Sequence, residues 1–177
     1  MIKLVSFDLQ GTLSDAGYSN KFWLEYLAEH KAFFKEIGVY DYRYYDDSYW
    51  VGNLREVMKP YTPRLDEEFL NFIATIKLPK IILSTTTKDF IELELGERQR
   101  LFDKCLSSLN DFGIAGKTPE VYEKVADMFG VKTSEILHIG DNLEMDIINA
   151  EKAGCQTVYY QGNVKQTIGE IKCKMKL

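Results

Sequence analysis

The sequence is poor in the residues that build disulfide frameworks, zinc–thiolate sites and histidine-based catalytic sites. It has three cysteines and two histidines among 177 residues, and no two cysteines stand at CxxC spacing. A cysteine nucleophile needs an activating partner, and neither His30 nor His138 stands in a recognisable nucleophile motif. These absences argue against a disulfide-stabilised secreted fold and against thiol catalysis, and they favour a reducing, cytoplasmic setting.

Long hydrophobic runs and an excess of basic charge are also absent. No apolar run approaches the ~20 residues of a membrane span, and the amino terminus lacks the pattern of a secretory signal. The net charge of −5 argues against a general nucleic-acid binder, which would show a basic face. We therefore expect no nucleic-acid or membrane partner, and either a monomer or a homodimer. The length suits one domain with an insertion.

What the sequence does contain is an alternation of strand and helix patterns. Short apolar runs rich in β-branched residues are typical of buried parallel strands, and helical patterns lie between them. This order predicts an α/β fold with a doubly wound parallel sheet. The expected strands are 2–7, 80–84, a weak one near 105–108, 135–139 and 155–160, and the expected helices are 87–95, 118–129 and 144–153. The basic tail 170–177 is expected to be a short, solvated or frayed helix.

The segment between the first two strands breaks this rhythm. Residues 17–76 contain no convincing strand, but residues 20–37 and 64–76 carry large apolar side chains at helical spacing. The pattern predicts a small α-helical cap, 17–76, inserted into an α/β core formed by 1–16 and 77–177. The many aromatic residues of the insert either form the core of the cap or line a substrate pocket beneath it.

An unusual loop follows the first strand: Asp8-Leu9-Gln10-Gly11-Thr12. It presents a carboxylate at the carboxyl end of a strand, where open α/β sheets bind their ligands. Asp8 is therefore a candidate nucleophile or metal ligand. Gln10 stands where a second carboxylate would be useful.

Further polar residues follow the later strands. Ser84 and Thr85 end or follow the strand 80–84, where hydroxyls and turn amides can hold phosphate oxygens or simply cap a helix. Lys117 precedes the helix that begins at the Thr-Pro pair 118–119. Asp141 and Asp146 follow the strand 135–139 and could face one hard cation, since Mg²⁺ prefers oxygen ligands.

These four motifs, in this order, resemble the haloacid dehalogenase (HAD) superfamily of hydrolases. The similarity extends over nearly the whole chain, from Asp8 to Gly154. The runs 8–13, 140–146 and 150–154 are its most specific parts, and the insert resembles the small helical cap of the family's first cap class. The resemblance implies a hydrolase with a Rossmann-like core.

The resemblance also implies a mechanism. Asp8 would attack phosphorus and form an aspartyl-phosphate. Mg²⁺ would be held by Asp8, by Asp141 and by the main-chain carbonyl of Gln10, with Asp146 beside or behind the metal, through water or by orienting Lys117.

The same resemblance assigns the phosphate-binding residues. Lys117 and Ser84, with amides near Thr85, would take the charge of the phosphoryl oxygens of a small phosphorylated substrate. Because phosphoryl transfer depends mainly on positioning and electrostatics, these contacts would supply much of the rate.

Gln10 departs from the pattern of the family's phosphatases, which have an aspartate there as general acid and base. A glutamine cannot transfer a proton at neutral pH, and the loss of general acid–base catalysis costs roughly 10²–10⁴ in rate. The chain is therefore expected to be a Mg²⁺-dependent phosphatase with weakened acid–base catalysis. Such an enzyme would be restricted to good leaving groups or would use a substrate or cap group as the acid.

Three alternatives stay open. A 2-haloacid dehalogenase also lacks that aspartate, but it has a tyrosine at this position and usually an arginine early in the cap, whereas the first arginine here is Arg43. A phosphonatase would need a cap lysine, for which Lys21 and Lys31 are available. A catalytically impaired phosphate- or metal-binding protein needs none of these groups.

Overall fold

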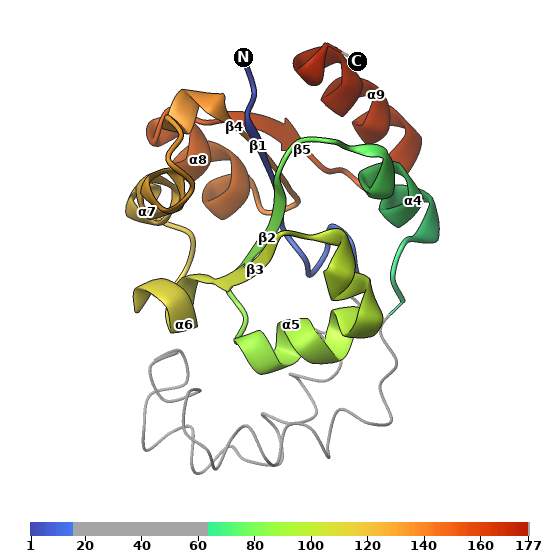
Figure 1. The fold of residues 1–177 in the computed structure, drawn as a ribbon, viewed down its shortest axis with the longest axis horizontal. Helices are drawn as coiled ribbons and strands as arrows, with labels where there is room; N and C mark the ends of the chain where they lie inside the picture. The colour runs from blue at the N-terminus through green and yellow to red at the C-terminus, as the bar shows by residue number, and fades with distance from the viewer. Residues whose placement is uncertain (16–63, 177) are drawn as a thin grey trace.

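The computed structural model describes residues 1–15 and 64–176, and Figure 1 shows their arrangement. Five parallel strands form one sheet in the order β3-β2-β1-β4-β5. They are β1 (Leu4–Phe7), β2 (Lys80–Ser84), β3 (Lys104–Ser107), β4 (Ile136–Gly140) and β5 (Gln156–Tyr159). The expected α/β fold with a doubly wound parallel sheet is confirmed, including the weak strand near 105–108.

The order of the strands places one end of β1 at a topological switch point. β1 pairs with β2 on one side and with β4 on the other. The chain builds outward to β3 and then crosses back to β4 and β5. In open α/β sheets the crevice for ligands opens at the carboxyl ends of the strands where the order reverses. Asp8 and Asp141 directly follow β1 and β4, so both lie at this point.

Helices cover the two faces of the sheet (Figure 1), with α4 and α9 on one side and α7 and α8 on the other. The α-helices are α4 (Glu67–Thr75), α5 (Lys88–Leu95), α6 (Ser108–Phe112), α7 (Pro119–Phe129), α8 (Asn149–Lys152) and α9 (Val164–Met175). Short 3₁₀ segments span Gly96–Leu101 and Thr133–Glu135, and a π-helical turn spans Leu143–Ile148. Within residues 1–15 and 64–176, no helix has the length and apolar character needed to cross a membrane.

Each face of the sheet has its own hydrophobic cluster. On the first face Phe7 packs edge-on against Phe69 of α4, with ring centroids 5.9 Å apart. On the second face Leu4 belongs to a cluster with Tyr122 of α7. Because all four residues of β1 are buried, the strand is fixed from both sides. The loop that begins at Asp8 therefore starts from a rigid support.

Helix α7 has the boundaries that its sequence predicts. Thr118 occupies the N-cap position, Pro119 is in the first turn, and Gly130 ends the helix at a φ of 62°. Proline has no amide hydrogen to lose in the first turn, and glycine adopts the left-handed conformation without strain. The start of α7 fixes the backbone next to Lys117.

The expected helix 144–153 is divided in two. A π-helical turn is followed by the single turn of α8. The side chain of Asn142 accepts hydrogen bonds from the amides of Glu144 and Met145 and caps this irregular start. Local capping geometry of this kind does not appear in hydrophobic periodicity. π-helical turns are frequent at functional sites.

The prediction for the tail was wrong in extent. Helix α9 begins at Val164, and Asn163 caps it by accepting a hydrogen bond from the amide of Gln166. Ile171 is fully buried in the first cluster. The lysines of the tail suggested a solvated segment, but they lie on the outer face of a helix whose apolar face docks on the sheet.

Helix α4 falls inside the expected insert but packs on the core. Phe69 and Ile73 are fully buried in the cluster that contains Phe7, and Asp66 caps the helix by accepting from the amide of Phe69. The last dozen residues of the segment 17–76 therefore support the sheet. Residues 16–63, which include most of the expected cap, lie outside the described residues. The division into a core and a cap stays a prediction.

The three cysteines are free thiols. Burial raises the pKa of Cys105 to about 11 and that of Cys155 to about 12. Both thiols are therefore protonated, and poorly nucleophilic, at neutral pH.

Candidate active site

The loop after β1 holds Asp8 at the bottom of the site. The carbonyl of Leu9 accepts hydrogen bonds from the amides of Thr12, Leu13 and Ser14, which closes the loop tightly. Gly11 has a φ of +89°, and a Cβ there would lie 2.3 Å from Oδ2 of Asp141. Only glycine meets both conditions. The loop thus brings the backbone of residue 11 against the carboxylate that follows β4.

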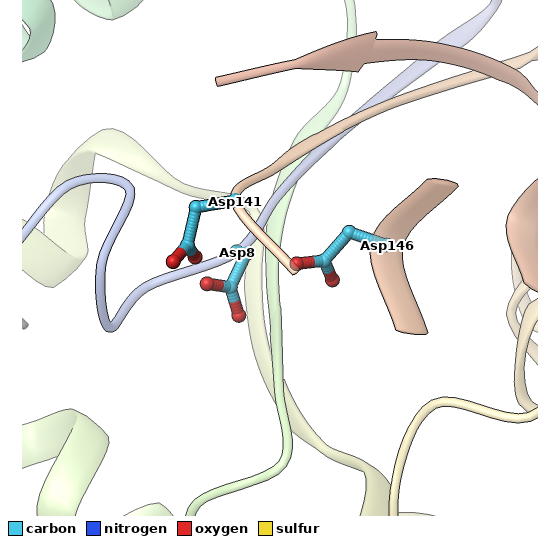
Figure 2. Close-up of side chains that lie close together, drawn as sticks. All are labelled: Asp8, Asp141 and Asp146. Atoms are coloured by element: carbon cyan, nitrogen blue, oxygen red, sulfur yellow. The ribbon is translucent and has the colours of Figure 1, made fainter. Parts of the chain in front are cut away.

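Three carboxylates meet at this point (Figure 2). Oxygen atoms of Asp8, Asp141 and Asp146 lie within 4.8 Å of one another. Thr12 lies between two of them, since its Oγ1 is 3.3 Å from Oδ2 of Asp8 and 3.2 Å from Oδ1 of Asp141. A hydroxyl has one proton to donate, so Thr12 serves one carboxylate at a time and leaves the other without that donor.

Asp146 reaches the cluster from the π-helical turn. Its Oδ2 accepts a hydrogen bond of 2.9 Å from the amide of Asn142, and its side chain is fully buried. A Cβ at Gly140 would lie 2.3 Å from its Cγ, so the end of β4 leaves space that the carboxylate fills.

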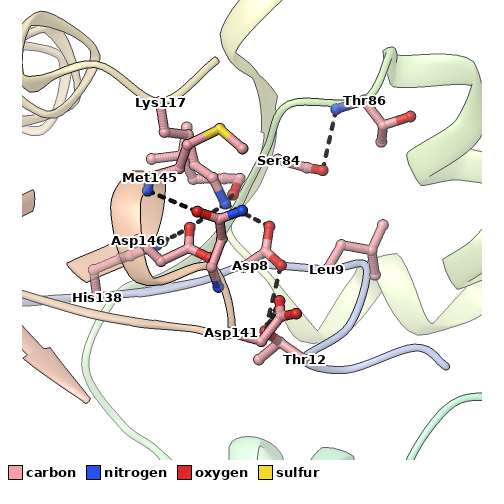
Figure 3. Close-up of polar contacts among 12 residues, drawn as sticks. Asp8, Leu9, Thr12, Ser84, Thr86, Lys117, His138, Asp141, Met145 and Asp146 are labelled. Atoms are coloured by element: carbon pink, nitrogen blue, oxygen red, sulfur yellow. Dashed lines mark hydrogen bonds and ion pairs between the residues drawn. The ribbon is translucent and has the colours of Figure 1, made fainter. Parts of the chain in front are cut away.

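The side chain of Lys117 joins two of the carboxylates (Figure 3). Its Nζ lies 2.5 Å from Oδ1 of Asp8, forms an ion pair with Oδ1 of Asp146, and is 3.4 Å from the carbonyl oxygen of Leu83. An ammonium has three protons to donate, and these three oxygens accept them. The side chain of Asn149 donates to the carbonyl of Lys117 and fixes its backbone.

His138 also belongs to this network, through a contact that the sequence did not indicate. Its Nε2 is 3.0 Å from Oδ1 of Asp146 and its Nδ1 is 2.9 Å from Oγ of Ser6. Because burial lowers the pKa of His138, the ring is neutral. Nε2 then donates to the carboxylate and Nδ1 accepts from the serine hydroxyl. Ser6 and His138 are register partners on β1 and β4. Their contact can therefore be predicted only when the pairing of these strands is known.

The pKa values reflect this crowding. Burial raises the pKa of Asp8 to about 8, against the lowering effect of the Lys117 ammonium. Burial acts in the same sense on Asp146, but Lys117 and His138 outweigh it and hold the pKa of Asp146 well below its usual range. The pKa of Lys117 is raised, because the attraction of Asp8 and Asp146 exceeds the opposing effect of burial.

The charges of the site suit a divalent cation. Three carboxylates face one ammonium, so the ionised cluster keeps an excess of negative charge. The side-chain atoms of the cluster that could bind a metal are all carboxylate oxygens, which are the ligands that hard cations prefer. A nearby cation also favours the charged form of a buried carboxyl such as Asp8. The cluster could therefore hold a divalent metal ion.

Ser84 and Thr85 lie at the end of β2, the strand beside β1. Ser84 is buried, and its Oγ accepts a hydrogen bond of 3.2 Å from the amide of Thr86 (Figure 3). Thr85 is half-buried. The hydroxyl of Ser84 therefore stabilises the turn after β2, and both residues lie next to the carbonyl of Leu83 that accepts from Lys117.

On the other side of Asp8, Gln10 contacts a residue that the sequence had not singled out. Its Nε2 donates a hydrogen bond of 2.5 Å to Oε1 of Glu94, and Oγ of Ser14 donates one of 2.8 Å to Oε2. Glu94 is 3% exposed. Burial raises its pKa, against the lowering effect of the hydrogen bonds from Gln10 and Ser14. The sequence did indicate that Glu94 is buried, because helical spacing places it on the face of α5 that contains Phe90 and Ile91.

The α/β fold places an acidic cluster at the switch point of the sheet, where open α/β sheets bind their ligands. The family of haloacid dehalogenase-like hydrolases matches residues 2–154. Because this match covers most of the chain, the protein belongs to that family and is a hydrolase. The expected family membership is thus confirmed.

Solved structures of similar fold include both phosphatases and dehalogenases. A HAD phosphatase from Thermococcus onnurineus superimposes with a TM-score of 0.73 at 17% identity, over 98% of each chain. A predicted phosphoglycolate phosphatase from Haemophilus somnus gives 0.66 at 16% identity, over 99% of this chain and 98% of that one. A dehalogenase with an intermediate complex gives 0.66 at 18% identity, over 98% of this chain and 96% of that one. These identities establish a shared fold only. No curated protein sequence matches the chain.

Proposed function

We propose that the protein is a Mg²⁺-dependent phosphatase that acts on a small phosphorylated metabolite in the cytoplasm, as a monomer or homodimer. Asp8 is the nucleophile, and Gln10 leaves general acid–base catalysis weakened. The observation that carries the proposal is the cluster of Asp8, Asp141 and Asp146, two of whose carboxylates pair with the ammonium of Lys117.

The metal ligands in this proposal are Asp8, Asp141 and the main-chain carbonyl of Gln10, with Asp146 behind them. The bound cation would neutralise phosphoryl charge and keep Asp8 ionised. Thr12, which lies between Asp8 and Asp141, donates to one of these two carboxylates at a time.

Lys117 holds the nucleophile and the phosphoryl group together. Its ammonium fixes Oδ1 of Asp8 and leaves Oδ2 on the side of Asp141. Oδ2 attacks phosphorus, the bond to the leaving oxygen breaks, and its electron pair departs with that oxygen. Ser84 and the amides near Thr85 contact the phosphoryl oxygens at the end of β2. His138 keeps Asp146 ionised and in place for Lys117.

Gln10 determines which substrates suit this site. Its amide can hydrogen-bond a leaving oxygen but cannot protonate it. Stable leaving groups such as nitrophenolate or acetate depart without that proton, whereas alkoxides do not. We therefore expect activated phosphates to be hydrolysed faster than alkyl phosphates.

The same site has a second candidate function, a 2-haloacid dehalogenase-type hydrolase. The observation in its favour is the absence of a carboxylate at position 10, together with dehalogenases among the proteins of similar fold. Asp141 argues against it, because its carboxylate lies beside that of Asp8 and completes a cluster that could hold a metal ion, which a metal-independent dehalogenase does not need. A catalytically impaired phosphate- or metal-binding protein is the remaining alternative.

The test is hydrolysis of acetyl phosphate and p-nitrophenyl phosphate with and without Mg²⁺. We expect turnover only with the metal, and none in Asp8→Asn. The matched control Asp127→Asn removes an exposed aspartate of α7 and should keep full activity. Metal-independent release of chloride from 2-chloroacids would contradict the proposal in favour of the dehalogenase. Binding of Mg²⁺ without turnover of any activated phosphate would favour the impaired binder.

A further inference from the structure

The amide of Gln10 is held by one end. Its Nε2 lies 2.5 Å from Oε1 of Glu94, a contact that joins two residues 84 positions apart in the chain. Nε2 is the end of the amide that donates to Glu94, so the carbonyl oxygen Oε1 of Gln10 points away from that side chain. Gln10 is half-buried, and it lies in the loop that directly follows Asp8.

We propose that Glu94 is a positioning residue, which orients Gln10 so that Oε1 of its amide accepts a hydrogen bond from the water that hydrolyses the phosphorylated Asp8. This inference rests on the proposed function. It gives Gln10 a positive role, in the second half of the reaction, in place of a mere loss of acid–base catalysis.

The proposed step balances without a basic side chain at position 10. The water oxygen attacks phosphorus, the bond between phosphorus and the Asp8 oxygen breaks, and its electron pair returns to the carboxylate. The water proton passes to a phosphoryl oxygen, and dihydrogen phosphate leaves. Glutamines that orient an attacking water in this way, without taking its proton, are known in GTP-hydrolysing enzymes.

The burial of Glu94 supports a specific purpose for the contact. A buried carboxyl is costly unless hydrogen-bonded or paired, and among residues 1–15 and 64–176 no basic side chain forms an ion pair with Glu94. Its hydrogen bonds come from Gln10 and Ser14, both in the loop that follows Asp8. An apolar side chain at the same place on α5 would pack beside Phe90 and Ile91 without that cost.

The competing explanation is that Glu94 only ties α5 to the loop. Substitution of Ser14 distinguishes this explanation from the positioning role. The hydroxyl of Ser14 donates to Oε2 of Glu94 and does not contact the amide of Gln10. Ser14→Ala therefore weakens the tie and leaves the orientation of the amide intact. Glu94→Leu removes both hydrogen bonds, and Glu94→Gln keeps an oxygen that can accept from Nε2 of Gln10.

The experiment measures, by rapid quench with radiolabelled acetyl phosphate and Mg²⁺, the separate rate constants for formation and breakdown of phosphorylated chain. We expect Glu94→Leu to slow breakdown about 10²-fold, the cost of a misplaced reacting group, and to change formation much less. Glu94→Gln should restore most of the breakdown rate. Ser14→Ala should keep the wild-type breakdown rate even where its melting temperature is lower.

Gln10→Met provides a second route, which does not depend on the folding of the Glu94 variants. It removes the amide while Glu94 remains, and it should slow breakdown as much as Glu94→Leu. Unchanged breakdown in Gln10→Met, or an equal loss of both rate constants in Glu94→Leu, would overturn the inference. If the wild type takes up no phosphoryl group at all, the proposed function itself is contradicted and the inference falls with it.

Discussion

The two sides of Asp8 differ in what they offer the carboxylate. On one side, the side chains of Lys117, Asp146 and His138 are at most 2% exposed and are joined by ion pairs and hydrogen bonds. On the other side, the half-buried Gln10 leads by a neutral amide to Glu94. The first side holds fixed charges. The second side places an amide, which cannot transfer a proton at neutral pH, in the loop that follows Asp8.

This difference separates two components of catalysis that are often discussed together. Electrostatic stabilisation depends on preorganised charges in a site protected from water, and the Lys117 side has them. General acid–base catalysis needs a titratable group within hydrogen-bond reach of the transferred proton, and Gln10 is not one. Variants on the two sides should therefore fail in different ways.

The largest effect is expected for Lys117→Met. The substitution leaves Asp8 and Asp146 buried without their shared ammonium, and breaking a buried ion pair costs about 3–5 kcal/mol. Chemical denaturation should show this loss, and turnover of p-nitrophenyl phosphate should fall by roughly 10²–10³. Lys124, whose side chain is 43% exposed and pairs with Glu120 on α7, gives the matched control. Lys124→Met should change neither stability nor turnover measurably. An equal loss of turnover in both variants would contradict a specific role of Lys117.

The next effect concerns the metal. Asp141→Asn removes one negative charge from the cluster of three carboxylates without changing its shape. We expect the Mg²⁺ concentration for half-maximal activity to rise about 10–100-fold, by analogy with the loss of supporting contacts at metal sites. The stabilisation of the chain by Mg²⁺ in a thermal melt should shrink in parallel. A variant with unchanged Mg²⁺ dependence would place the metal elsewhere.

A gain of function is expected on the other side. Gln10→Asp supplies a group that can protonate the leaving oxygen, and Glu94 next to it would raise the pKa of the new carboxyl by like-charge repulsion. Turnover of alkyl phosphates should rise about tenfold or more, with little change for p-nitrophenyl phosphate. Steady-state kinetics on both substrates tests this. If both activities fall, Gln10 has a role that an aspartate cannot replace.

The smallest effect is a change in how stability depends on pH. Burial raises the pKa of Glu94, so the fold favours its protonated form. Its contribution to the free energy of unfolding is complete below the ordinary glutamate pKa of about 4.3 and is lost as pH rises through the raised value. Glu94→Gln should remain comparatively stable over that interval. Urea titrations of both proteins at several pH values measure the difference. Parallel curves of unfolding free energy against pH would contradict a raised pKa of Glu94.

Most of the fold could be predicted from the sequence, because local patterns determine its strands and helices. The five strands and the boundaries of α7 follow from apolar runs, a Thr-Pro start and a glycine stop. Helix α9 was underestimated because the lysines of the tail hid its apolar face, with Ile171 at its centre. The π-helical turn depends on a cap by Asn142 that periodicity does not reveal.

For the site, motif residues could be named from the sequence, but their partners could not. Asp8 and Asp141 each stand in a recognisable run, whereas Lys117 could be named only from its place among the other motifs. Glu94 reaches Gln10 across 84 residues, and His138 meets Ser6 only through the pairing of β1 with β4. Contacts of this kind require the tertiary arrangement, since neither residue of the pair carries a local signal of the other.

The most direct test of the central proposal is whether Asp8 becomes phosphorylated. The chain is mixed with acetyl phosphate and Mg²⁺, quenched in acid, and analysed as intact protein and as peptides by mass spectrometry. We expect one phosphoryl group, on Asp8, that accumulates in the wild type because the breakdown of the intermediate lacks a general base. We also expect no label without Mg²⁺ or in Asp8→Asn. Turnover with no phosphorylated chain, or a label on another residue, would contradict the account.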